Sequence, residues 1–261
     1  MSTLIAKNQI ATFLLELAFC LGLLVMISRA RAGKKVPEIR KVNGLDALDE
    51  AIGRATEMGR PVHYSPGIGD LSNSQTLASF ALLAYVARMC AKYDTRLIVS
   101  SRIPTVTPVM EETVRAAYTD MNKADSYNPN DIRFLSDDQF GYASGVVGLM
   151  QREQVAANVL FGAFWAESLI FAEVGSQSGA IQISGTANTA QIPFFVAACD
   201  YTLLGEEIYA ASAYLSRDPI LVGNLIGQDW GKWAAAALIA IGAILSTINP
   251  KVNALKTWLL K

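Results

Sequence analysis

The sequence contains few of the residues on which metal and thiol chemistry depend. Its 261 residues include one histidine, His63, and three widely separated cysteines, Cys20, Cys90 and Cys199. One histidine cannot form the cluster that holds a metal ion, and an odd, scattered set of cysteines predicts neither a disulfide framework nor a metal site. We therefore expect no metal site, and we expect the cysteines to be small buried hydrophobic residues.

Motifs for phosphate binding and for hydrolysis are missing as well. No glycine run is followed by Gly-Lys-Ser/Thr, so there is no P-loop, and there is no Gly-x-Ser-x-Gly nucleophile elbow. Glu167 and Glu173 would share a helix face poorly, and Glu206 and Glu207 are typical of a solvated pair. The sequence predicts no catalytic residue and identifies no cofactor, which argues against an enzyme.

Charged residues are scarce, at 17% of the chain against 52% hydrophobic residues, and they are unevenly distributed. Residues 42–216 carry 10 Lys/Arg and 19 Asp/Glu, whereas the two ends together carry 12 and 4. An acidic central region repels a phosphate backbone, so nucleic acid is not an expected partner. Basic ends beside apolar segments suit the surface of an anionic membrane.

The first apolar segment, Ile10 to Ile27, is just long enough to cross a membrane as a helix. Six basic residues follow it within residues 29–41, and only Lys7 precedes it. This asymmetry predicts a helix at 1–28 in the cell membrane and a basic juxtamembrane linker at 29–44, with the N-terminus outside and the next domain in the cytoplasm. A cleaved signal peptide would carry its basic residues before the apolar core.

Glu16 lies inside this first segment, where a carboxylate is costly. Two interpretations stay open: Glu16 has a partner or a function there, or it reaches water near the helix end or is protonated.

A second apolar segment predicts a C-terminal membrane helix at 218–249, followed by an interfacial tail at 250–261. Its most apolar part runs from Trp233 to Ile248. The tail lysines would lie outside, against the charge rule, so full spanning stays open.

Apolar strand-like runs alternate with helical patterns between residues 45 and 217. This alternation predicts a cytoplasmic α/β domain with a Rossmann-like, mostly parallel, doubly wound sheet. It does not predict the order of the strands. We expect strands at 61–65, 96–101, 131–136, 158–164, 180–186 and 194–200, and helices at 76–92, 107–121, 137–153, 167–175 and 204–216.

Ligands of such a sheet bind at the carboxyl ends of its strands. The residues expected there, as a tentative ligand site, are His63, Ser65, Gly67, Gly69, Asp70, Ser100, Ser101, Arg102, Ser184, Thr186 and Asp200. The stretch Gly67 to Asp70 is either a tight turn or a nucleotide-binding loop. The turn is favoured, because Ser72 replaces the third glycine of the fingerprint and Asp70 would repel a pyrophosphate. His63 is interpreted as a core or crevice residue, and a role as general base is the less favoured alternative.

Small residues recur every four positions in the second apolar segment, at Gly223, Gly227, Gly231 and Ala235. Such a stripe lets another helix approach closely. The partner is either the first membrane helix of the same chain or a second copy.

The stretch "GRPVHYSPGIGDL" and the run from "GVVGLMQREQ" at Gly145 to "YLSRDP" at Pro219 resemble a family of prokaryotic membrane proteins defined only as a domain of unknown function. The resemblance covers residues 40–220 and implies a prokaryotic, membrane-attached domain without assigning an activity. Together with the segments above, it favours a membrane-anchored structural or scaffolding subunit that forms a homo-oligomer or joins a membrane complex. The alternatives are a membrane-anchored binder or sensor of a nucleotide-like ligand and, third, an enzyme at the strand-end crevice.

Overall fold

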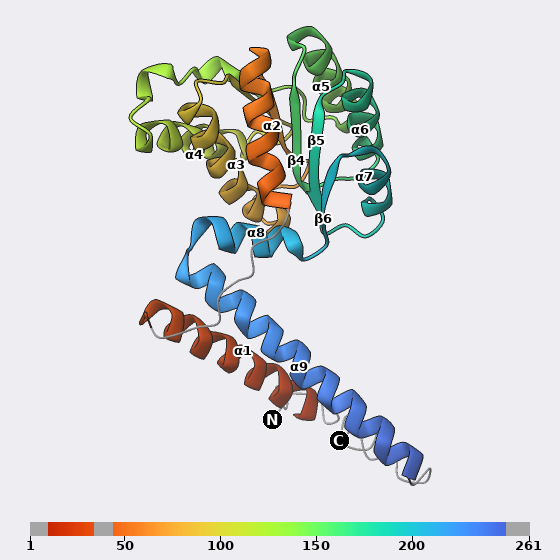
Figure 1. Ribbon diagram of the computed structural model, residues 1–261. Coiled ribbons are helices and arrows are strands. Elements are labelled where there is room, and N and C mark those ends of the chain that lie inside the picture. Colours follow the sequence, from red (N-terminus) through yellow and green to blue (C-terminus); the bar gives the residue numbers. More distant parts are fainter. Residues whose placement is uncertain (1–9, 34–43, 249–261) are drawn as a thin grey trace, which may run out of the picture. The chain divides into compact units, whose positions relative to one another are not determined.

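The computed structural model describes residues 10–33 and 44–248 (Figure 1). The chain divides into two compact units, of which residues 40–216 form one and the two chain ends form the other. The expected tail at 250–261 and most of the expected linker lie outside the described residues.

The central unit contains a six-stranded sheet in which every strand pair is parallel. The strand order is β3-β2-β1-β4-β5-β6. This is the order of the dinucleotide-binding fold, in which the chain changes direction across the sheet between β1 and β4. The predicted parallel α/β sheet is thus confirmed. Its strands are β1 (Val62–Gly67), β2 (Leu97–Ser101), β3 (Ile132–Phe134), β4 (Ala157–Ala163), β5 (Ile181–Thr186) and β6 (Tyr201–Leu204).

Helices cover both faces of the sheet, as the doubly wound layout requires. Two short 3-10 turns, Ala124–Ser126 and Pro129–Asp131, lead into β3. The first face is covered by α2 (Gly44–Met58), α3 (Ser74–Lys92), α4 (Thr107–Asp120) and α8 (Glu207–Ser216), and the second by α5 (Gln139–Glu153), α6 (Glu167–Gln177) and α7 (Ile192–Ala198).

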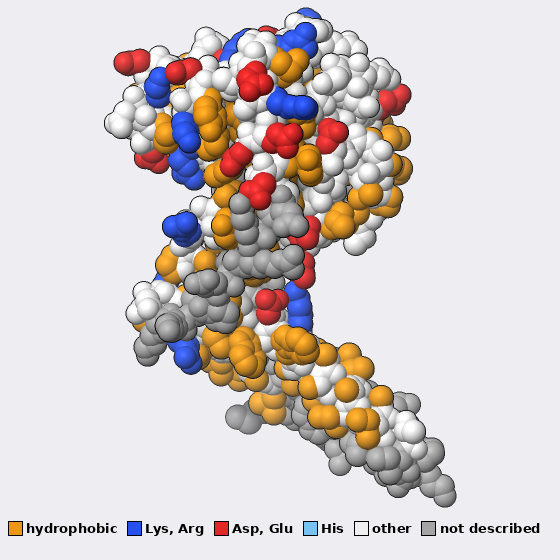
Figure 2. Space-filling model, in the orientation of Figure 1, with side chains coloured by type: hydrophobic (Ala, Val, Ile, Leu, Met, Phe, Trp, Pro, Cys, Tyr) orange, Lys and Arg blue, Asp and Glu red, His pale blue; other side chains and the backbone are white. Residues whose placement is uncertain are grey.

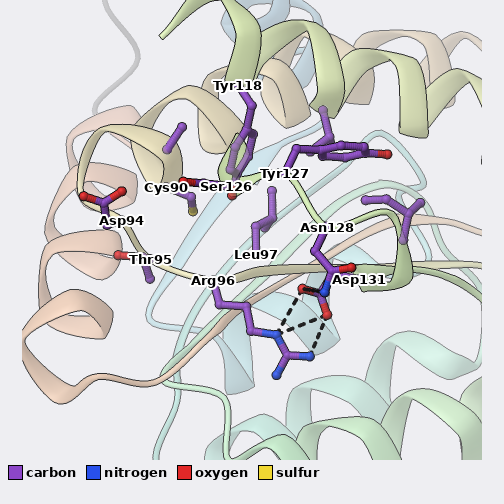
Figure 3. A pocket seen from close by; sticks show the side chains of 13 residues that line it. Cys90, Asp94, Thr95, Arg96, Leu97, Tyr118, Ser126, Tyr127, Asn128 and Asp131 are labelled. Carbon is purple, nitrogen blue, oxygen red and sulfur yellow. Dashed lines mark hydrogen bonds and ion pairs between the residues drawn. The ribbon is translucent and has the colours of Figure 1, made fainter. Parts of the chain in front are cut away.

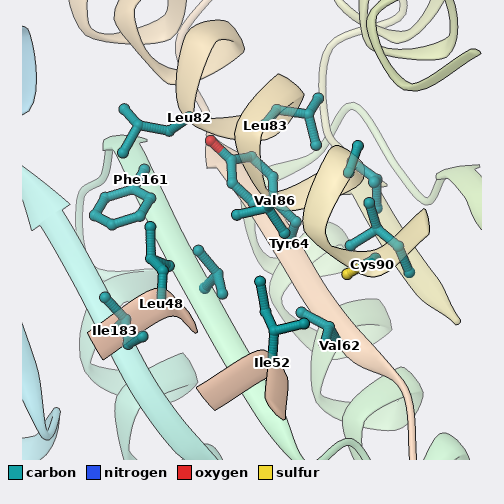
Figure 4. Packing of buried hydrophobic residues seen from close by; sticks show 14 of the residues in the cluster. Leu48, Ile52, Val62, Tyr64, Leu82, Leu83, Val86, Cys90, Phe161 and Ile183 are labelled. Atoms are coloured by element: carbon teal, nitrogen blue, oxygen red, sulfur yellow. The ribbon is translucent and has the colours of Figure 1, made fainter. Parts of the chain in front are cut away.

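Alternation along the strands separates an apolar face of the sheet from a partly polar one. In β1, Val62 and Tyr64 face the first helix layer and pack among Leu48, Ile52 and other apolar side chains (Figure 4). His63 and the other alternate residues of β1 face α5 to α7 instead, where the second apolar cluster lies. The first cluster is the larger of the two and stabilises the domain mainly through burial of apolar surface.

Two segments differ from the sequence-based expectation. Residues 194–200 were expected to form a strand, but they belong largely to helix α7, which has Pro193 in its first turn. Short apolar runs fit either structure, and the proline was the overlooked helix signal. Helix α2 was not predicted, although the spacing of its buried Leu45, Leu48 and Ile52 is helical.

The described residues of the second unit include two long helices, α1 (Ile10–Arg31) and α9 (Pro219–Ile248). Within the described part of the chain, one helix segment, Phe13–Arg31, is long and apolar enough to cross a membrane by length and composition. A signal sequence passes the same test. The test does not select α9, so the expected C-terminal membrane helix is not shown.

Candidate functional site

The carboxyl edge of the sheet is closed at the point between β1 and β4. The amide of Ile68 donates to the carbonyl oxygen of Ala163 at 2.8 Å, which continues the pairing of β1 with β4 beyond the strand end. Gly67 has a φ of +81°, and a Cβ there would lie 2.8 Å from the carbonyl carbon of Ala163. The glycine is therefore needed for the close contact between the two strands.

The loop after β1 uses its polar groups internally. Asp70 is exposed and accepts hydrogen bonds from the backbone and hydroxyl of Ser72, which lower the pKa of Asp70. A Cβ on Gly69 would contact the hydroxyl of Thr76, and among the described residues this hydroxyl is the one buried side-chain polar atom without a hydrogen-bond partner. Arg102 donates to the carbonyl oxygen of Ile68 at 3.4 Å. These contacts are those of a packed tight turn.

The carboxyl ends of β5 and β2 are also occupied by contacts within the domain. Thr186 donates from its hydroxyl to Gln75 in the first turn of α3 at 3.1 Å, and Ser184 shares a hydrogen bond of 3.0 Å with Thr202. Ser101 donates to the carbonyl oxygen of Ile103. All five hydroxyl-bearing residues of the expected site, Ser65, Ser100, Ser101, Ser184 and Thr186, are buried, so this edge offers a ligand few free polar groups.

His63 belongs to a buried polar network that crosses the sheet. Its Nδ1 lies 2.7 Å from Oδ1 of Asn158, and its Nε2 lies 2.9 Å from the hydroxyl of Ser100. Asn158 donates in turn to Oε1 of Gln182 at 3.1 Å. His63, Asn158 and Gln182 stand opposite one another on three adjacent strands, β1, β4 and β5. The network therefore ties these strands together.

The network has one self-consistent set of donors and acceptors. Because Oδ1 of Asn158 can only accept, Nδ1 of His63 carries the proton and Nε2 accepts from Ser100. The phenol of Tyr142 then bridges Ser100, at 3.0 Å, and Ser65, at 2.8 Å. This set requires a neutral imidazole. Burial lowers the pKa of His63 from 6.5 to about 4, which keeps the ring neutral at physiological pH.

The structure distributes the eleven tentative ligand residues over several separate sets of contacts. His63, Ser65 and Ser100 meet in the buried network, and the others in the carboxyl-edge loops make separate contacts. Asp200 was placed at the carboxyl edge in error. It precedes β6, and its carboxylate accepts from the backbone amide of Gln182 at 2.7 Å, near the start of β5. The wrong strand at 194–200 caused this misplacement.

A cavity of about 340 Å³ lies at the opposite, amino edge of the sheet, where β2 and β3 begin (Figure 3). The rings of Tyr118 and Tyr127 meet edge to face with their centroids 6.1 Å apart, and Cys90 of α3 and Leu97 of β2 also line the cavity. The volume is at the lower end of the range for small-molecule sites. Sequence analysis missed this cavity.

The charged wall of the cavity is an ion-pair cluster. Arg96 donates from Nε to both carboxylate oxygens of Asp131 at 3.1 Å and from Nη1 to Glu153 at 2.8 Å. These hydrogen bonds, led by those to Asp131, raise the pKa of Arg96. Arg133 adds a second guanidinium 2.9 Å from Glu153. The cluster joins the starts of β2 and β3 to the end of α5, and its charges already satisfy one another.

The glycine stripe of α9 faces α1. A Cβ on Gly223 would lie 2.7 Å from Cα of Ile27, and one on Gly227 would lie 2.6 Å from the side chain of Leu23. Gly231 meets the ring of Phe19 in the same way. The two helices are therefore antiparallel, and the stripe is used for a contact within the chain.

The α1–α9 pair presents large apolar side chains outward. Leu24 of α1 is 62% exposed, and Trp233 and Ile239 of α9 are 74% and 72% exposed. Figure 2 shows hydrophobic side chains gathered along these helices. Close packing thus leaves most of the apolar surface of the pair uncovered, which is unusual for helices in water.

Comparison with curated proteins and with solved structures gave no match. The comparison with protein families gave one result that covers nearly the whole chain, including both long helices and the central domain. The chain belongs to the family described as a domain of unknown function, DUF6754, whose sequence model matches residues 1–257.

Proposed function

We propose that this protein is a membrane-anchored structural or scaffolding subunit whose α1–α9 pair crosses the membrane twice and whose α/β domain lies in the cytoplasm. The observation that carries the proposal is the packing of the pair. Gly223 and Gly227 bring the two backbones together, and the apolar side chains point away from the contact. In lipid, small residues at the contact and apolar residues outside are the normal arrangement.

The dimensions and charges of the pair support this proposal. The 30 residues of α9 extend about 45 Å at 1.5 Å per residue, more than the hydrocarbon core requires. Arg29 and Arg31 close the last turn of α1, and further basic residues follow in the sequence. Positive charge at this end favours a cytoplasmic domain.

A scaffolding role for the domain fits the way in which it uses its polar groups. The backbones of Gly67 and Ala163 are in close contact between β1 and β4, the place where dinucleotide-binding folds hold their ligand, and Asp70 adds a negative charge in the loop that follows β1. The buried network around His63 stabilises the sheet and has no exposed member. A nucleotide-binding function at this edge is therefore the less supported alternative.

Alkaline carbonate treatment of membranes from cells that express the full chain tests the anchor. We expect the protein to stay in the pellet and to be released by detergent, because carbonate removes proteins bound by charge but not helices held by buried apolar surface. Release of the full chain into the supernatant by carbonate alone would contradict the proposal.

A further inference from the structure

The cavity at the amino edge of the sheet has an apolar inner end and a polar mouth. Cys90, Leu97 and Val114 line the inner end and are almost fully buried. The mouth is formed by exposed residues of the turns before β3, among them Ser126 and Asn128. Apolar walls with a few polar groups are the usual composition of a small-molecule site, and a volume of about 340 Å³ suits a molecule at the small end of that class.

One polar group of this cavity has no partner within the described part of the chain. Tyr118 is 6% exposed, yet its hydroxyl makes no hydrogen bond with a described residue, and its oxygen is not enclosed by protein atoms. The other two buried tyrosines of the described domain are bonded: Tyr64 donates to a backbone carbonyl at 2.6 Å, and Tyr142 bridges two serines. Buried tyrosine hydroxyls normally find a partner. Figure 3 shows Tyr118 reaching from α4 toward Cys90 and Leu97, so a molecule in the cavity can supply that partner.

The inner end of the cavity offers a hydrogen-bond donor and no charge. Burial raises the pKa of Tyr118, and the nearby Cys90, Asp131 and Asp94 add to this shift. The phenol therefore stays protonated at neutral pH and can donate its O–H to an acceptor. Burial likewise raises the pKa of the Cys90 thiol, which leaves that side chain neutral. A carbonyl oxygen is the kind of group that this end can bind.

The charged groups beside the cavity already neutralise one another. Asp94 accepts from Lys123 at 2.7 Å, and Asp131 accepts from Arg96 at 2.6 Å. An anionic ligand would meet these two carboxylates, and a cationic ligand would compete for them with Lys123 and Arg96. Because a charge without a partner is costly to bury, the cavity suits a neutral molecule.

We propose that this cavity binds a small neutral organic molecule whose apolar body lies beside Cys90 and Leu97 and whose carbonyl oxygen accepts from the hydroxyl of Tyr118. The α/β domain would then hold a ligand at the amino edge of its sheet, away from the closed carboxyl edge. This inference goes beyond the proposed scaffolding role. It concerns the domain alone, so it stands whether or not the helix pair crosses a membrane.

Three molecules of the same shape and different charge test the class of ligand. Benzamide is neutral and carries a carbonyl oxygen, benzoate is an anion, and benzamidinium is a cation. Thermal unfolding of the full chain in detergent is measured with each of them at millimolar concentration. We expect benzamide to raise the melting temperature saturably, because it binds the folded domain and not the unfolded chain. Benzoate and benzamidinium should leave the melting temperature unchanged.

Tyr118→Phe tests the hydrogen bond, because it removes the hydroxyl and keeps the ring. The variant should fold with wild-type stability, since the hydroxyl has no partner among the described residues. We expect it to bind benzamide more weakly on the order of fivefold, the net effect of one hydrogen bond. Tyr85→Phe is the matched control: it also removes a phenol oxygen, but Tyr85 does not line the cavity, so its affinity for benzamide should be that of the wild type.

Equal affinity of Tyr118→Phe and the wild type for benzamide would overturn the inference. Equal shifts of the melting temperature with all three molecules would also overturn it, because the cavity would then not select a neutral ligand. No shift with benzamide would show that the cavity holds water only.

Discussion

Gly67→Ala is expected to destabilise the α/β domain by about 4 kcal/mol, an exceptionally large effect for the addition of one methyl group. The methyl group would meet the backbone of Ala163, and strand β4 cannot move away without breaking the hydrogen bond to Ile68. The φ of +81° adds backbone strain for any residue with a Cβ. Circular dichroism during urea unfolding of the full chain in detergent measures this decrease in the free energy of unfolding.

Gly205 provides a matched control, because it has a φ of +58° and an added Cβ there meets nothing within 4 Å. Gly205→Ala should cost only the backbone strain, about 1 kcal/mol. An equal loss of unfolding free energy in the two variants would show that the close contact between β1 and β4 is not what requires glycine at position 67.

Acidification is expected to weaken the domain through His63. Burial lowers the pKa of His63 to about 4 from 6.5, so the unfolded chain binds a proton at mildly acidic pH while the folded domain does not. The neutral imidazole makes its full contribution to the free energy of unfolding above pH 6.5, and this contribution is lost as the pH falls toward 4. Between pH 6.5 and pH 5 the loss should be about 2 kcal/mol, at 1.36 kcal/mol per pH unit.

His63→Gln separates this effect from the titration of carboxylates, since glutamine offers hydrogen bonds but no titratable group. The variant should be less stable than the wild type at pH 7. Its free energy of unfolding should nevertheless decrease by about 2 kcal/mol less than that of the wild type on acidification to pH 5. Parallel stability curves for the two proteins between pH 7 and pH 5 would show that His63 titrates normally and is not held neutral by the network.

Local patterns in the sequence predicted most of the strands and helices of the fold. Buried parallel strands appear as continuous apolar runs, such as residues 97–101, and helices show periodic apolar positions, so five of the six strands were placed close to their observed positions. The error at α7 arose where the pattern is ambiguous, because a seven-residue apolar run suits either structure. The strand order depends on contacts between distant segments, which no local pattern contains.

The candidate sites, too, could be predicted only where neighbouring residues in the sequence determine the structure. The interpretation of Gly67 and Gly69 as turn glycines followed from their neighbours Asp70 and Ser72, and the packing of both glycines agrees with that interpretation. The cavity at the amino edge was missed because its walls come from α3, α4 and the turns before β3. One signal was available: Arg96 and Asp131 each precede a strand, and the starts of neighbouring parallel strands lie together.

Two-sided cysteine labelling tests the central claim, that both long helices cross the membrane. Single cysteines at the exposed Asn128 and Thr247 are introduced into a chain carrying Cys20→Ser and Cys199→Ser, in which the buried Cys90 stays. Because α9 separates the domain from Thr247, a membrane-impermeant maleimide should label Thr247→Cys in intact cells and Asn128→Cys only after lysis. Labelling of both positions from the same side of the membrane would contradict the account.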